Sequence, residues 1–78
     1  MGRPLRYREL LRKLRVFGVD EKDSPSGGSK RMLYKENVEG RKRSYPIDTH
    51  SEHHEFGLPI INPILRHFKI HPDEFWKV

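Results

Sequence analysis

The sequence predicts an α+β domain of two layers, in which the elements follow the order α-β-β-β-α and a short C-terminal helical turn comes last. Three observations predict this class: an amphipathic helical pattern near the start, two strand-like runs around a glycine turn, and a proline-initiated helix near the end. Because each helix has one apolar stripe to bury, we expect a three-stranded antiparallel sheet with helices on one face. At 78 residues, positions 1–78 are expected to form a single domain.

The first element is predicted to be a helix over residues 4–17. Its apolar side chains recur at helical spacing and cover about a third of the helix circumference. They are Tyr7, Leu10, Leu11, Leu14 and Phe17. Gly18 is expected to end the helix, since glycine is the usual residue just after a helix C-terminus.

A short edge strand and a loop are predicted to follow the first helix. Residues 19–23 are polar and lie just after a glycine, which favours a brief strand at the edge of the sheet. Residues 24–29 contain only serine, proline and glycine, a composition that is typical of loops.

The centre of the chain is predicted to form a β-hairpin. Residues 30–36 and 41–47 are strand-like, and residues 37–40 connect them with Gly40 at a position of positive φ. Pro46 has no N–H to donate, so the second of these strands should lie at an edge. Two apolar pairs each share a face of their own strand: Met32 with Tyr34, and Tyr45 with Ile47.

Residues 48–55 contain no apolar side chain and show no periodicity, so they are predicted to form a surface loop. The dipeptide Asn62-Pro63 then supplies an N-cap and a first helical residue, which predicts a helix over 62–68. The next proline, Pro72, is expected to open the final turn.

Phe75 and Trp76 follow in that final turn and are expected to cover one end of the core. The alternative for these two aromatic residues is a homodimer interface.

Composition excludes several classes of site. The chain has no cysteine, so it forms neither disulfides nor thiolate metal sites. No apolar run approaches the roughly 20 residues that a membrane-spanning helix needs, and we expect no secretory segment at the start. These features favour a cytoplasmic protein without membrane contact, and nothing in the sequence points to a cofactor.

Positive charge is concentrated in two parts of the chain. The formal net charge is +5, and residues 3–17 carry six basic side chains against the one carboxylate of Glu9. A second basic excess lies in residues 30–43. Fixed cations that neutralise phosphates release condensed counterions, so this pattern favours a polyanionic partner. A charged surface that only contacts water is the alternative.

A nucleic acid is one such polyanion, and recognition of RNA shape, for example, requires little more than well-placed cations at phosphates and 2′-hydroxyls. In the first helix, arginines at i, i+4 and i+7 form a basic stripe beside the apolar face. The predicted RNA contacts are Arg8, Arg12, Arg15, Lys30, Arg31, Arg41, Lys42 and Arg43.

Five phrases occur in order along the chain: ELLRKL at 9–14, FGV at 17–19, GSKRMLY at 28–34, GRKRSYPI at 40–47 and PILRHF at 63–68. Together with the order of elements, they resemble the HicA family of small toxins from type II toxin–antitoxin pairs. The resemblance covers nearly the whole chain. It implies a fold like that of double-stranded RNA-binding domains, metal-independent cleavage of messenger RNA, and neutralisation by a HicB-type antitoxin.

The resemblance also implies a catalytic site. Family members usually carry Gly-Ser-His at the start of the second strand, and here the matching residues are Gly28, Ser29 and Lys30. A second histidine usually follows the end of the third strand, and the nearest one here is His50. Because lysine stays protonated near neutral pH, we assign Ser29 and Lys30 to RNA contact, Lys30 at the scissile phosphate. His50, or else His53 or His54, would act as acid or base.

Two other interpretations remain open from the residues alone. The first is a non-catalytic RNA-binding module of the same fold, since lysine replaces the usual catalytic histidine at Lys30. The second is a metal site in residues 50–55, which contain histidine and glutamate. Adjacent ligands in a loop, without a second ligand cluster, are a poor metal site, so we expect no metal.

Overall fold

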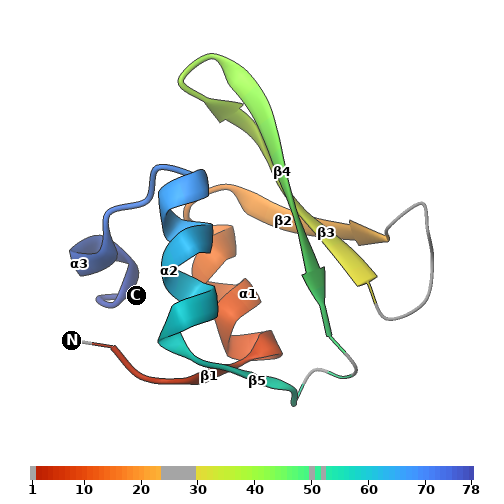
Figure 1. Ribbon diagram of the computed structural model, residues 1–78. Helices are drawn as coiled ribbons and strands as arrows, with labels where there is room; N and C mark the ends of the chain where they lie inside the picture. Colours follow the sequence, from red (N-terminus) through yellow and green to blue (C-terminus); the bar gives the residue numbers. More distant parts are fainter. Residues whose placement is uncertain (1, 24–29, 50, 52) are drawn as a thin grey trace.

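The computed structural model describes residues 2–23, 30–49, 51 and 53–78. Its longer strands form an antiparallel sheet in the order β2-β3-β4, and α1 and α2 lie on one side of this sheet (Figure 1). The predicted α+β class with its three-stranded antiparallel sheet is confirmed. The elements are β1 (Leu5–Arg6), α1 (Tyr7–Val16), β2 (Val19–Asp23), β3 (Lys30–Val38), β4 (Arg41–Asp48), β5 (Glu55–Phe56), α2 (Leu58–His67) and α3 (Pro72–Phe75).

The strand register decides which residues of the hairpin face the helices. Leu33 in β3 is fully buried and lies opposite Tyr45 in β4. Because side chains alternate along a strand, Tyr45 and Ile47 share the inner face with Leu33, whereas Met32 and Tyr34 point to the outer face. The two apolar pairs seen in the sequence therefore lie on opposite faces of the sheet.

A two-residue loop joins β3 to β4, because β3 continues to Val38; the predicted connection over residues 37–40 was therefore too long, whereas the positive φ of Gly40 is as predicted. Glu39 and Gly40 have φ values of 53° and 85°, and the side chain of Asn37 accepts a hydrogen bond from the N–H of Gly40 at 2.7 Å. Positive φ at both loop residues is the geometry of a type I′ turn. Pro46 lies within β4, which is an edge strand of the sheet, as expected.

The first helix begins at Tyr7, so the prediction that it starts at Pro4 is wrong. Leu5 and Arg6 are extended and pair with β5 in the register Leu5 to Phe56 and Arg6 to Glu55. Leu5 is completely buried in this extended segment. Gly18, with φ of 86°, follows the helix C-terminus as predicted.

The second helix begins at Leu58, four residues before the predicted start at Asn62. Gly57 is its N-cap, and Pro63 lies inside the helix. Pro63 removes one main-chain hydrogen bond there. The earlier start places Ile61 one turn before Ile64, and both side chains are fully buried. Burial of this additional residue favours the longer helix despite the internal proline.

The core lies between the helices and the inner face of the sheet. The largest fully buried side chains are Phe68, Phe75, Leu5, Leu10, Leu14, Leu33, Ile61, Ile64, Leu65 and Val19. The short helix α3 is capped by His71, whose Nδ1 accepts a hydrogen bond from the N–H of Asp73 at 3.1 Å. Phe75 is buried and Trp76 packs against the core, which is the arrangement expected for core-covering residues.

Candidate functional site

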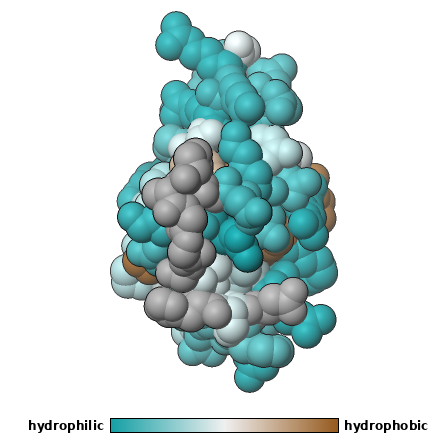
Figure 2. All heavy atoms as spheres, turned by 90° about the vertical axis from the view of Figure 1, so that its right-hand side faces the viewer, coloured by the Kyte–Doolittle hydropathy of each residue, from teal (hydrophilic) through white to brown (hydrophobic). Residues whose placement is uncertain are grey.

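A basic pocket lies between α1 and the end of the sheet formed by β2 and β3. It encloses about 390 Å³ and brings together side chains from both basic segments of the sequence, residues 3–17 and residues 30–43. Its lining residues are Tyr7, Arg8, Leu11, Arg15, Glu21, Arg31, Thr49 and Ser51. The described surface on this side of the molecule is mainly hydrophilic (Figure 2). Three arginines and one glutamate give the pocket an excess of positive charge.

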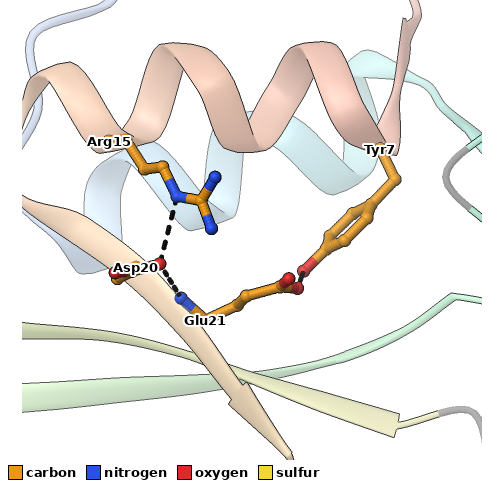
Figure 3. Close-up of polar contacts among 4 residues, drawn as sticks. All are labelled: Tyr7, Arg15, Asp20 and Glu21. Carbon is orange, nitrogen blue, oxygen red and sulfur yellow. Dashed lines mark hydrogen bonds and ion pairs between the residues drawn. The ribbon is translucent and has the colours of Figure 1, made fainter.

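Helical spacing places two of the arginines together. Arg8 and Arg15 are seven residues apart on α1, with Leu11 between them on the same face. The Nε of Arg15 donates to Asp20 at 3.1 Å, which directs the guanidinium along β2 (Figure 3). A guanidinium has five N–H donors, so donors remain for a ligand after this contact.

The third arginine comes from the sheet. Arg31 is directly opposite Asp23 in the register of β3 and β2, and its Nη1 donates to that carboxylate. Arg31 is only partly exposed, and the strand alternation turns it toward α1 rather than toward the outer face. The two aspartates of β2, Asp20 and Asp23, thus orient two of the three pocket arginines.

A tyrosine and a glutamate complete the pocket. The hydroxyl of Tyr7 donates a hydrogen bond to the carboxylate of Glu21 (Figure 3). Burial, together with this hydrogen bond, raises the pKa of the Tyr7 hydroxyl, and the nearby charges of Arg31 and Arg15 oppose the rise. The Tyr7 hydroxyl therefore interacts with charged groups from α1, β2 and β3.

The sequence interpretation missed both residues of this pair. The helical period places Tyr7 on the apolar face of the helix, which is correct for its ring, and the polar composition of residues 19–23 marks Glu21 only as part of an edge strand. One signal was present: Val19 and Glu21 are two residues apart in a strand, so they share a face. A buried valine at one position places the glutamate on the inner face as well.

Lys30 does not line the pocket, although its neighbour Arg31 does. Lys30 is the first residue of β3, lies opposite Asp48 of β4 and is exposed. Since successive strand residues point to opposite faces, its side chain belongs to the outer face. Ser29 and His50, the other residues assigned by the family resemblance, lie outside the described residues.

The remaining predicted RNA contacts lie away from the pocket. Arg12 is exposed on α1. Arg41 and Lys42 are exposed beside the hairpin turn, which is far from the pocket end of the strands in Figure 1. Arg43 donates from Nη1 to the main-chain oxygen of His67 at 3.3 Å, so it contacts α2.

Two of the histidines that follow β4, His53 and His54, lie among the described residues. The ring of His54 stacks on Phe56 with centroids 4.5 Å apart, and its main-chain oxygen accepts the N–H of Tyr7 at 2.8 Å. His53 is exposed. Within residues 2–23, 30–49, 51 and 53–78, no group of three side chains is arranged to hold a metal ion. Two residues of the loop considered for metal, His50 and Glu52, are not among these.

None of the helices in the described part of the chain is both long and apolar enough to cross a membrane. Comparisons of the chain with protein-family models, with curated proteins and with solved structures found no match.

Proposed function

We propose that this protein binds RNA through the basic pocket and acts as a HicA-like toxin, an endonuclease of messenger RNA that needs no metal. The observation that carries the proposal is that Arg8, Arg15 and Arg31 line one pocket. They come from two elements that are separate in the sequence, and we expect their guanidinium groups to bind phosphate groups of one RNA backbone. The resemblance to HicA toxins in the order of elements and in five short phrases supports the same conclusion.

The chemistry of the pocket suits a phosphate backbone. Guanidinium groups bind phosphate oxygens through paired N–H donors, and their charge does not depend on pH in the physiological range. The net charge of +5 adds a long-range attraction for any polyanion. A HicB-type antitoxin with an acidic surface would compete for the same arginines and so block RNA directly. Messenger RNA as target makes the cytoplasm the expected compartment.

Two observations favour a second candidate, a non-catalytic RNA-binding module of the same fold. No histidine occurs among the described residues that line the pocket. Lysine also stands at position 30, where HicA toxins carry their catalytic histidine. This module would use the same arginines, so the two candidates differ in chemistry and not in binding.

Binding of a labelled single-stranded RNA at several salt concentrations tests the proposal. Each phosphate contact that is removed should lower the slope of log Kd against log salt by about 0.7. We expect this loss for Arg8→Ala and Arg31→Ala. The matched control is Arg66→Ala, because Arg66 is an exposed arginine of α2 outside the pocket.

Equal slopes for the wild type, the pocket variants and the control would refute binding in the pocket. Incubating the same RNA with the wild-type protein in the presence of a chelator separates the two candidates: cleavage supports the toxin, and binding without cleavage supports the module.

A further inference from the structure

One carboxylate lines the positive pocket together with the three arginines. Glu21 is the one acidic side chain among the described residues that line it. A pocket that served only to hold phosphate would lose affinity through a negative charge at this position, since like charges repel over short distances. The placement of Glu21 therefore calls for a role other than affinity.

The pocket's other acidic neighbours are already used by arginines, whereas Glu21 is not. Asp20 pairs with Arg15, and Asp23 pairs with Arg31. Among the described residues Glu21 forms no ion pair, and its side-chain hydrogen bond is the one from Tyr7. A carboxylate without a bound cation keeps lone pairs available to accept a proton.

Tyr7 holds this carboxylate in a fixed position. The tyrosine is 4% exposed, and its ring stands edge-on to Phe56 with centroids 6.0 Å apart. Tyr7 is the first residue of α1, and its main-chain N–H donates a hydrogen bond to the main-chain oxygen of His54. Because burial and Glu21 raise the pKa of the Tyr7 hydroxyl, the phenol keeps its proton and remains a donor to the carboxylate.

We propose that Glu21 is the general base of RNA cleavage in this pocket and that Tyr7 is the residue that positions it. This inference rests on the function proposed above, and it assigns the chemistry to residues other than Lys30 and His50. The arginines hold the phosphate next to the reacting 2′-hydroxyl and neutralise the charge that develops on its oxygens.

The bond changes and proton transfers involve only the RNA, Glu21 and water. Glu21 takes the proton of the 2′-hydroxyl, and the 2′-oxygen forms a bond to the adjacent phosphorus. The bond from phosphorus to the 5′-oxygen of the next nucleotide breaks, and this oxygen takes a proton from water. The hydroxide that remains takes the proton from Glu21. The products are an RNA with a 2′,3′-cyclic phosphate end and an RNA with a 5′-hydroxyl end.

Single-turnover cleavage of a labelled RNA in a chelator-containing buffer tests this assignment. Glu21→Gln keeps an acceptor for the Tyr7 hydroxyl but is no base, so cleavage should slow at least about 100-fold, within the usual range for a general base. The Kd for RNA should stay the same or decrease, because a negative charge leaves the pocket. The control is Glu36→Gln, an exposed glutamate of β3 outside the pocket, which should cleave at the wild-type rate.

Tyr7→Phe tests the positioning role. It removes the hydrogen bond and keeps the buried ring, so kcat should fall about tenfold while KM is unchanged, as expected for a misplaced base. A substrate with a 2′-deoxynucleotide at the cleaved position should resist the wild-type protein. Thermal unfolding of each variant establishes that it is folded.

Wild-type rates for Glu21→Gln would overturn the inference and leave RNA cleavage to other residues. Binding of RNA by the wild type without cleavage would overturn it as well, and would leave the non-catalytic module in place. Absence of RNA binding would overturn both the inference and the proposed function. Loss of cleavage in Glu21→Gln with retained binding supports the inference.

Discussion

The Nε2 atom of His67 lies 2.7 Å from the main-chain oxygen of Ser44, which connects the end of α2 to β4. A carbonyl oxygen only accepts hydrogen bonds, so Nε2 carries the hydrogen in this pair. The His67 ring also stands edge-on to Tyr45 and Phe68, at centroid distances of 5.3 and 5.1 Å. One side chain thus combines a hydrogen bond with two aromatic contacts at the junction of helix and sheet.

Substitution of His67 should separate these two contributions. His67→Phe keeps an aromatic ring and loses the hydrogen bond, so we expect the free energy of unfolding to fall by about 0.5–1.5 kcal/mol. His67→Ala loses the ring contacts as well and should be less stable than His67→Phe. Urea unfolding measures both values, with His53→Ala as the control at an exposed histidine. Equal stability of the two His67 variants would contradict a role for the ring.

Substitutions at the two adjacent residues of the loop between β3 and β4 should change the free energy of unfolding in opposite directions. Glu39→Asn should raise the free energy of unfolding by up to about 1 kcal/mol, because asparagine tolerates the left-handed conformation better than glutamate does. The ion pair that is lost, Glu39 with Lys69 at 3.8 Å, is exposed and contributes little.

Gly40→Ala should instead lower the stability by about 1 kcal/mol or more, because φ is 85° at this residue. No heavy atom lies within 4 Å of an added Cβ there, so a loss of stability reports the backbone conformation and not a steric clash. Thermal unfolding of both variants provides the measurement. An unchanged melting temperature in Gly40→Ala would show that the loop adopts another conformation.

Lys13 is a basic residue of the N-terminal segment that the fold removes from solvent. It is 5% exposed, its Nζ donates to the main-chain oxygen of Val78, and the same atom lies 5.9 Å from the ring centroids of Phe75 and Trp76. Burial, followed by the positive charges of Arg12 and Arg3, lowers the pKa of Lys13. Lys13 of α1 therefore contacts residues 75–78, the C-terminal segment, through a hydrogen bond and two aromatic rings.

We therefore expect Lys13→Ala to expose Trp76, the one tryptophan of the chain, and to move its fluorescence emission to longer wavelength. Lys13→Met keeps most of the apolar stem and should cause a smaller shift. Lys77→Ala is the control, since Lys77 is exposed close to the same aromatic residues in the sequence. If Lys13→Ala left the emission unchanged, the C-terminal segment would be held by its aromatic contacts alone.

Local patterns predicted most of the elements. The apolar period of α1, the glycine after it, the hairpin with Gly40 and the edge position of the strand with Pro46 all depend on residues that are near one another in the chain. The errors concern the helix starts, the length of the hairpin connection and the pair of short strands β1 and β5, which was not predicted. The helix α1 begins late because Leu5 and Arg6 pair with β5, some fifty residues away, and no local pattern reveals such a partner.

In the candidate site, too, features that depend on nearby residues were predicted and contacts between distant residues were not. The basic stripe of α1 and the basic start of β3 were visible in the sequence, and Arg8, Arg15 and Arg31 came from that pattern. The roles of Lys30 and His50 stay predictions. The pairing of Tyr7 with Glu21 was not foreseen, since neither residue type indicates a site by itself.

The sequence by itself determined the amount of positive charge, its concentration in two segments, and the periods that make a helix or a strand. Only the tertiary structure decided that Arg31 and not Lys30 meets the arginines of α1, and that Glu21 stands among them. The physical reason is that a strand turns alternate residues to opposite faces, so a register set by distant pairing and by burial of Leu33 selects which charges share the pocket.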